Sequence, residues 1–184
     1  QSLASRKADL IDDIAREIAS AHRPEGADGE TAEAFVRHIY ADVPPRDVIA
    51  WSRAKLLGVP LALWRALADR TPDRPAIRVA NPTADTDGWD AAGTVIQLVN
   101  DDKPFLVDSV TAALQREGLD VHVAIHPIFE VTRAESGALQ TVRPPPLDPE
   151  TNRIAAEAPL ESLIHLEIDR IAEESARTAL AERL

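Results

Sequence analysis

The sequence lacks several features that mark common classes of protein. It contains no cysteine, which excludes a disulfide scaffold, a zinc–thiolate site and a cysteine nucleophile. Its seven glycines form neither a G-x-G-x-x-G pattern nor a phosphate-binding loop, so the chain offers no dinucleotide-binding motif. No apolar run approaches the ~18 residues that a membrane-spanning helix requires, and residues 1–10 are too polar for a signal peptide. We therefore expect a soluble protein.

Methionine is also absent, and the chain begins at Gln1. Because translation starts at methionine, we expect a trimmed product or an excised piece of a longer protein. A length of 184 residues suits one compact domain or two small ones. A composition of 45% apolar and 28% charged residues is typical of a globular chain rather than a disordered one.

Positive charge is scarce, since 20 Lys and Arg against 31 Asp and Glu give a net charge of 20 − 31 = −11. Phosphate contacts require a basic surface, so we expect neither nucleic acid nor an anionic membrane as a partner. Carboxylates are too frequent in so acidic a chain for a pair of them to identify an acid–base catalyst.

Apolar residues recur at helical spacing through the first part of the chain. A cluster of prolines and turn residues at 71–75 predicts the boundary between a helical unit, 1–72, and a second unit, 73–184. Trp51 and Trp64 are expected to be core residues rather than ligand contacts. The predicted helices cover residues 3–21, 30–40, 46–57 and 59–69, with Gly58 as the break between the last two.

The second unit changes to alternating periodicity and predicts an α+β fold. One helix is expected to begin near Pro104 and end at Gly118, and another to cover 170–184. A proline-rich insertion at 143–160 is expected to form an exposed loop. This order is most of a split βαβ, ferredoxin-like sheet with helices on one face, and it lacks the last strand, which is expected after Leu184. Strands are predicted at 76–80, 94–99, 121–132, 139–142 and 162–169.

Acidic residues cluster where a predicted strand runs into a helix. The segment Asn100–Phe105 reads N-D-D-K-P-F, and Asp108 follows in the first helical turn. Asp101 or Asp102 is expected to cap the helix, because aspartate favours that position and complements the helix dipole. The alternative is a binding site in which Asn100, Asp101 and Asp102 receive the ammonium group of a ligand.

Histidines and a glutamate form a second polar group on two predicted strands. Alternation places His122 and His126 on one face of their strand, and pairing with the strand at 162–169 would bring His165 and Glu167 beside them. These residue types could ligate zinc, but no tight motif supports a metal, and a polar sheet face is the expected alternative. We expect this mixed face to pack against another domain or subunit. Its candidate interface residues are Val95, Gln97, His122, His126, His165 and Glu167.

Several blocks of this sequence resemble a known family. The stretch 95–120, with a strand, N-D-D-K-P-F, a helix and Gly118, resembles an ACT-type regulatory domain. More specifically, residues 35–180 are similar to the N-terminal region of the very large bacterial NAD-specific glutamate dehydrogenases. The similar blocks, in the same order, are Y-A-D-V-P (40–44), N-D-D-K-P-F-L-V-D-S-V (100–110), H-V-A-I-H-P (122–127) and E-S-L-I-H-L-E-I-D-R (161–170).

The resemblance implies a cytoplasmic parent enzyme that oxidises L-glutamate to 2-oxoglutarate and ammonia with NAD. The catalytic and nucleotide-binding parts of the family lie downstream of such a segment, so no catalytic residue and no NAD site is carried onto this chain. Other domains and subunits of a homo-oligomer are the implied partners. In ligand-binding ACT domains a glycine follows the proline of the turn, whereas this chain has Phe105, whose ring would occupy the space for a ligand.

Three functions are open at this point. The preferred hypothesis is a non-catalytic regulatory or assembly segment of a glutamate dehydrogenase. The second is an amino-acid sensor that binds an effector at the Asn100–Phe105 turn, with Asp108 as a further candidate ligand residue. The third is a free-standing adaptor unrelated to the enzyme.

Overall fold

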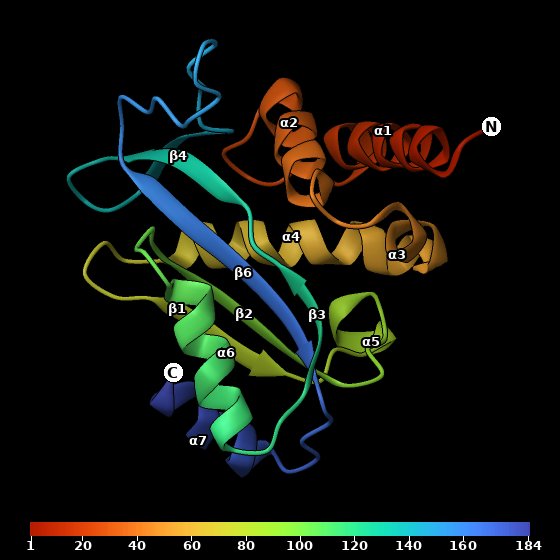
Figure 1. Cartoon of the computed structure of the whole chain (residues 1–184), viewed down its shortest axis with the longest axis vertical. Helices are drawn as coiled ribbons and strands as arrows, with labels where there is room; N and C mark the ends of the chain where they lie inside the picture. The colour runs from red at the N-terminus through yellow and green to blue at the C-terminus, as the bar shows by residue number, and fades with distance from the viewer.

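The first helices of the computed structural model, which describes residues 1–184, follow the predicted apolar periodicity. α1 (Leu3–Ala21) begins after Ser2, whose hydroxyl accepts a backbone N–H of the first turn. α2 (Gly29–Tyr40) begins in the same way after Asp28. Such side chains satisfy donors that the start of a helix leaves free. The two helices pack against each other above the sheet (Figure 1).

The next two helices differ from the prediction. α3 (Pro45–Ala50) is short, and α4 (Arg53–Asp69) runs without interruption through Gly58, so the expected break at this glycine was wrong. The start of α4 is set by Ser52, whose hydroxyl accepts a backbone N–H three residues ahead. Gly58 permits a close contact instead, because a Cβ at this position would lie 2.2 Å from Cδ1 of Trp89.

α4 also contains a proline, which a neighbouring helix accommodates. Pro60 has no backbone N–H, so the carbonyl oxygen of Leu56, four residues earlier, has no helical donor. The hydroxyl of Tyr40 on α2 donates to this oxygen across 2.8 Å. Tyr40 is 0% and Leu56 1% exposed, so this bond satisfies a carbonyl that water does not reach.

Six strands form one antiparallel sheet: β1 (Ala76–Ala80), β2 (Thr94–Asp101), β3 (Val121–Ile125), β4 (Ile128–Arg133), β5 (Leu139–Arg143) and β6 (Leu160–Ile168). The strand order is β1-β2-β6-β4-β5, and β3 also pairs with the central strand β6, next to β4 (Figure 1). The single strand expected at 121–132 is thus two strands. Pro127 lies between them and lacks the N–H that would continue the ladder.

β1 occupies the edge of the sheet beside β2. It pairs antiparallel with β2 over its whole length, from Ala76 opposite Val99 to Ala80 opposite Val95. In a split βαβ sheet this place belongs to the last strand, which the sequence led us to expect after Leu184. In this structure β1, which precedes the βαβ unit in the chain, fills that place. The predicted α+β architecture is confirmed.

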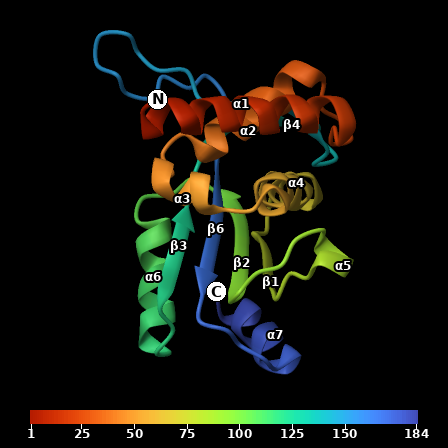
Figure 2. The same cartoon turned by 90° about the vertical axis from the view of Figure 1, so that its right-hand side faces the viewer.

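Helices cover both faces of the sheet. The remaining helices are α5 (Ala84–Asp87), α6 (Leu106–Arg116) and α7 (Glu174–Arg183). α4 and α6 lie on opposite sides of the sheet (Figure 2). The predicted alternation along β6 is confirmed, since Leu163 joins a core beneath the first four helices, while Ile164, Leu166 and Ile168 join a second core beneath α6 and α7.

The larger core joins the first four helices to the sheet. Its 24 buried residues come from these helices, from Val43 and Trp89 in connecting segments and from strands β2 to β6, so the helices complete a sheet face that would otherwise be exposed. Phe35 of α2 stacks on Phe129 of β4, with 4.8 Å between ring centroids, and meets the ring of Trp64 edge-on at 5.0 Å. Trp64 is therefore a core residue, as predicted. The division of the chain at 72/73 stays a prediction.

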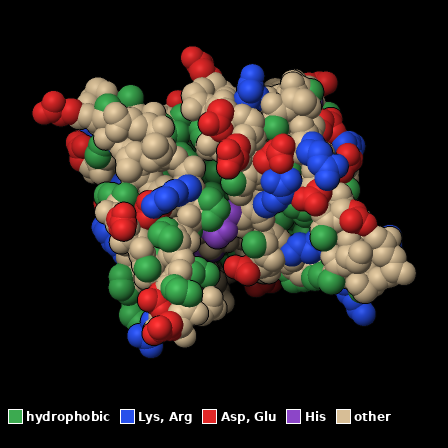
Figure 3. Space-filling model, turned by 90° about the horizontal axis from the view of Figure 1, so that it is seen from above, with side chains coloured by type: hydrophobic (Ala, Val, Ile, Leu, Met, Phe, Trp, Pro, Cys, Tyr) green, Lys and Arg blue, Asp and Glu red, His purple; other side chains and the backbone are tan.

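The proline-rich connection between β5 and β6 extends from the body of the molecule (Figure 1). It is largely exposed, and an isolated bridge joins Leu147 to Ile154 within it. On the face seen from above, acidic and basic side chains are interspersed rather than segregated (Figure 3). None of the helices combines the length and the apolar character needed to cross a bilayer.

Candidate functional site at the turn before α6 and beneath α4

The side chains of the predicted ligand-binding turn bond to neighbouring parts of the chain. Arg70, just after α4, donates through Nη2 to Oδ1 of Asp101 across 3.0 Å and to Oδ1 of Asn100 across 3.4 Å. Asp102 accepts from the hydroxyl of Ser162 on β6, with 2.8 Å between the oxygens. The turn is therefore held to the end of α4 and to the start of β6.

Phe105, rather than an aspartate, occupies the cap position of α6. Its backbone is left-handed, with φ 62°, and it forms no side-chain cap hydrogen bond, so the prediction that Asp101 or Asp102 caps the helix was wrong. This is the backbone region that glycine adopts without steric cost and other residues rarely do. Phe105 is 76% exposed, so the expectation that its ring occupies the space beside the turn was wrong. Asp108 is exposed in the first turn of α6.

A buried ion cluster beside this turn was not predicted. Arg70 is 4% and Glu161 3% exposed, and the two form a direct ion pair. Arg133 on β4 adds two bonds to the Glu161 carboxylate, from Nε and from Nη2, each 3.0 Å long. Burial opposes the charge of Arg70, but its bonds to Glu161 and Asp101 raise the pKa of Arg70 above its ordinary value. Both arginines thereby hold the end of α4 to the sheet.

A second group of enclosed polar residues lies between α4 and the sheet. The ammonium Nζ of Lys55 is 2.7 Å from Oε1 of Glu167. The other carboxylate oxygen of Glu167 is 3.2 Å from Nε2 of His165, whose Nδ1 is 3.2 Å from Nε2 of Gln97. Lys55 also lies 4.0 Å from the ring centroid of Trp51, a cation–π arrangement. We refer to Lys55, Glu167, His165 and Gln97 as the polar layer.

The order of bonds fixes the protonation of the polar layer. Burial lowers the pKa of His165 despite the nearby Glu167, so the imidazole is neutral at pH 7. A carboxylate only accepts hydrogen bonds, so Nε2 of His165 carries the proton and Nδ1 accepts from the amide nitrogen of Gln97. Burial acts to raise the pKa of Glu167, but hydrogen bonds from His165 and Lys55 outweigh it and lower that pKa.

Four of the six predicted interface residues lie beneath helices of the same chain. Val95, Gln97, His165 and Glu167 share the sheet face that α4 covers, with Val95 opposite Glu167 and Gln97 opposite His165 in the β2–β6 ladder. The first three are buried and Glu167 is half-buried. Their mixed polarity is therefore matched within the chain, by Lys55 of α4.

The other two predicted interface residues, His122 and His126, lie apart from the polar layer. The β3–β6 ladder sets Ile125, rather than a histidine, opposite His165. Both His122 and His126 are exposed, and Nε2 of His122 is 2.7 Å from a carboxylate oxygen of Asp169. The sheet does not bring the histidines together, and no group of three or more His, Asp or Glu side chains is placed to hold a metal ion.

Sequence reasoning missed Lys55, Glu161 and the two arginines that bind Glu161. A signal existed for two of them. Glu161 falls on the same alternation of β6 as His165 and Glu167, which assigns it to the same face. Lys55 is one of only three lysines in the chain and falls within an apolar helical pattern.

Comparison with known proteins identifies the family. The family described as "Glutamate dehydrogenase, ACT1 domain" matches residues 35–184. The chain belongs to this family. The resemblance to the N-terminal region of the NAD-specific glutamate dehydrogenases, and the ACT-like character of the sheet, are thereby confirmed.

Two curated relatives carry the name NAD-specific glutamate dehydrogenase. The protein of Halomonas elongata is 36% identical over 138 residues, which cover 75% of this chain and 8% of that protein. The protein of Pseudomonas aeruginosa is 33% identical over 129 residues, which cover 70% of this chain and 8% of that protein. The matched part of the chain thus spans less than a tenth of the length of these relatives. No solved structure matches the chain.

Proposed function

We propose that the chain is a non-catalytic segment that serves the regulation or assembly of a larger NAD-dependent glutamate dehydrogenase. The parent enzyme would oxidise L-glutamate to 2-oxoglutarate and ammonia, with NAD bound outside this segment. Membership of the ACT1 family and the much greater length of the two named relatives support this proposal. The partners of the segment would be other domains and subunits of a cytoplasmic homo-oligomer.

The observation that carries the non-catalytic role is the internal bonding of the enclosed titratable groups. Lys55, Glu167 and His165 bond to one another, and no buried side-chain nitrogen or oxygen lacks a partner. A general base or a nucleophile must reach an atom of a substrate. The polar layer instead joins α4 to β6, which supports a role in holding a rigid surface.

The experiment compares the full-length parent enzyme with a variant that lacks residues 1–184. Turnover per NAD-binding site at saturating glutamate should be retained, because no catalytic group is removed. The oligomeric mass in solution, or the response of turnover to effectors, should change. Loss of turnover from a variant that still forms the native oligomer would overturn the non-catalytic role. Identical mass and identical effector response would overturn the regulatory and assembly role.

The second candidate function is an amino-acid sensor at the Asn100–Phe105 turn. The observation that favours it is the backbone of Phe105, which keeps the left-handed conformation of a glycine while its ring points into solvent. The space beside the turn is therefore not filled by the ring. Calorimetric titration with amino acids tests this function, since binding at the turn should be lost in Asp102→Ala.

A further inference from the structure

The connection between β5 and β6, residues 144–159, projects from the body of the molecule (Figure 1). We refer to these residues as the arm. The arm is longer than the ~12–15 residues above which loops without regular structure are uncommon and usually functional. Most of its residues are exposed and none is buried. The arm therefore contributes little to the core of this chain.

Hydrogen bonds within the arm fix its conformation. At the tip, Oδ1 of Asp148 accepts the backbone N–H groups of Glu150 and Thr151. The N–H of Asp148 donates to the carbonyl oxygen of Arg153 across 2.8 Å, which joins the two halves of the arm. The run Pro144–Pro146 restricts the backbone of the first half, because each proline ring fixes φ.

A buried carboxylate holds the base of the arm. Glu130 of β4 is 4% exposed, and its Oε1 accepts from Nε of Arg143, at the end of β5, across 2.7 Å. Its Oε2 accepts the backbone N–H of Glu157 across 3.2 Å. Both ends of the arm are thereby fixed to the sheet. A segment ordered in this way before it meets a partner loses little conformational entropy on binding.

This ordered arm carries two large apolar side chains in solvent. Leu147 is 52% and Ile154 43% exposed, and they are two of the four exposed large hydrophobic residues of the chain. An isolated antiparallel bridge sets them opposite each other, and the backbone hydrogen bonds lie on either side of the pair. Side chains of such a pair share one face and lie close together. Leu147 and Ile154, the apolar pair, thus form one patch of the kind that marks an interaction surface.

The charge of the arm indicates the kind of surface that it fits. Asp148, Glu150 and Glu157 against Arg153 give residues 144–159 a net charge of 1 − 3 = −2. A second copy of this chain, whose net charge is −11, would repel such a segment. Charge complementarity therefore favours a basic surface that does not belong to this chain.

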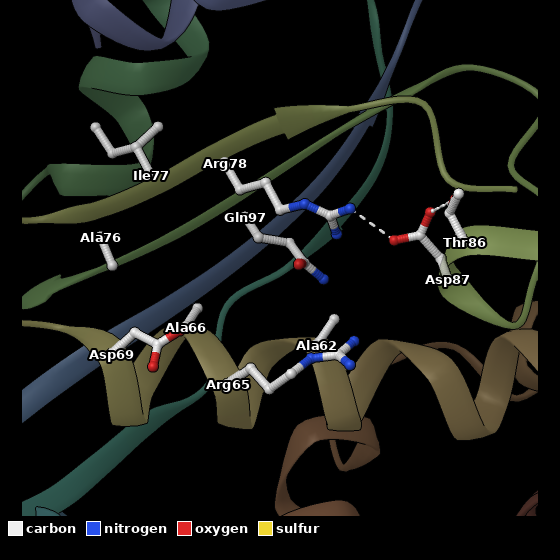
Figure 4. Close-up of a pocket in the computed structure, with 10 residues that line it drawn as sticks. All are labelled: Ala62, Arg65, Ala66, Asp69, Ala76, Ile77, Arg78, Thr86, Asp87 and Gln97. Carbon is white, nitrogen blue, oxygen red and sulfur yellow. Dashed lines mark hydrogen bonds and ion pairs between the residues drawn. The ribbon is translucent and has the colours of Figure 1, made fainter.

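The groove between α4 and β1 shows how poorly a second copy would receive the apolar pair (Figure 4). Arg65 and Asp69 line it from α4, and Arg78 of β1 lies 2.6 Å from Asp87. Apolar contact would take these charges out of water without giving them a partner. A more apolar hollow lies beside residues 4–11 of α1. A second copy docked at that hollow is the competing occupant, and the net charge disfavours it.

We propose that the apolar pair docks into an apolar groove with a basic rim on another domain of the parent enzyme. This inference rests on the proposed function, because it requires the larger enzyme, and it adds the contacting residues and the chemistry of their partner. The matched part of the chain spans 8% of each named relative, so most of the surface that such an enzyme offers to the arm lies outside this chain. Apolar burial would supply the affinity, and the acidic arm would be attracted to the basic rim.

The test compares tryptic cleavage after Arg153 in the full-length parent enzyme and in the isolated chain, where this residue is exposed. Docking covers the arm, so cleavage should be at least about tenfold slower in the parent. Leu147→Ser should restore fast cleavage, since it removes an exposed anchor and leaves the core intact. Leu147→Met should keep the protection. Leu3→Ser, which changes a residue that is 42% exposed outside the arm, is the matched control and should also keep it.

A photoreactive group identifies the partner. Replacement of Leu147 by p-benzoylphenylalanine in the parent enzyme, followed by irradiation, should link the arm to one segment outside residues 1–184. That segment should contain Lys or Arg beside apolar residues. The same replacement at Leu3 should not label it.

Three results would overturn this inference. One is an equal rate of cleavage after Arg153 in the parent and in the isolated chain. Another is protection that Leu147→Ser retains, because the apolar pair is then not the anchor. The third is a link from position 147 to residues 1–184 of a neighbouring subunit, which makes a second copy the partner. None of these results bears on the regulatory or assembly role itself, which the oligomeric mass and effector response of the truncated parent test separately.

Discussion

The hydrogen bond between the Tyr40 hydroxyl and the carbonyl of Leu56 predicts that removing this hydroxyl lowers the free energy of unfolding, and that the loss is smaller when Pro60 is replaced. Tyr40→Phe keeps the shape of a fully buried ring and removes only its hydroxyl. Because Pro60 offers no N–H, the Leu56 carbonyl then has no donor within reach. A buried carbonyl left unsatisfied costs about 1–3 kcal/mol, which we expect as the loss in free energy of unfolding.

Pro60→Ala provides the matched rescue, because alanine restores the missing helical N–H. In the Pro60→Ala background the Leu56 carbonyl keeps a donor when Tyr40 is changed, so Tyr40→Phe should cost only about 0.5–1 kcal/mol. Urea unfolding of the four proteins of this double-mutant cycle measures the coupling directly. Equal costs of Tyr40→Phe in both backgrounds, or a cost below about 0.3 kcal/mol in the native background, would refute the assigned role of the hydroxyl.

Further changes test the contacts around α4 and the turn by the same unfolding assay. Gly58→Ala should cost about 1–3 kcal/mol, because its Cβ would overlap the Trp89 ring; a gain, as helix propensity alone predicts, contradicts the contact. Lys55→Met should cost about 3–5 kcal/mol, because it leaves Glu167 enclosed without its cation, and the double variant with Glu167→Gln should lose less. Hydrogen bonds outweigh burial and lower the pKa of Glu167 in the folded chain, so the unfolded chain takes up this proton first as pH falls. The free energy of unfolding should therefore fall as pH drops below the ordinary value of 4.5, and less steeply in Glu167→Gln; equal slopes contradict this. Phe105→Gly should raise the free energy of unfolding by about 0.5–1 kcal/mol, because it relieves a left-handed backbone and removes an exposed ring; a loss contradicts that conformation.

Local pattern predicted most of the elements, because the periodicity of apolar residues is set by which face each element buries. It failed at Gly58, where it predicted a break between two helices and the structure has one, α4, which continues through Gly58 and Pro60. Here the compensation is tertiary, since Tyr40 supplies the missing donor and Trp89 fills the space beside the glycine. A residue 16 positions away in sequence cannot be identified as a donor from the helix pattern itself.

The candidate site was predicted in the same uneven way. Alternation along β6 correctly placed His165 and Glu167 on one face, but it does not name what covers that face. Lys55 is 112 positions from Glu167, and Arg70 is 91 positions from Glu161, so only the fold brings these charges together. Distant ion pairs of this kind leave no local signal beyond an isolated polar residue in an apolar pattern.

The left-handed turn at Phe105 shows the limit of local preference most clearly. Phenylalanine is a poor choice for a positive φ, so its own identity predicts an ordinary helix start. The resemblance to ACT domains pointed to this position as one where relatives have glycine, and the backbone keeps that conformation.

The most direct test of the central claim is a spectrophotometric assay of the isolated chain with L-glutamate and NAD. Because the enclosed titratable groups Lys55, Glu167 and His165 are bonded to one another and the chain has no dinucleotide-binding motif, no NADH should form at any concentration of the chain. Formation of NADH in proportion to the amount of chain added, retained through repeated purification, would contradict the account.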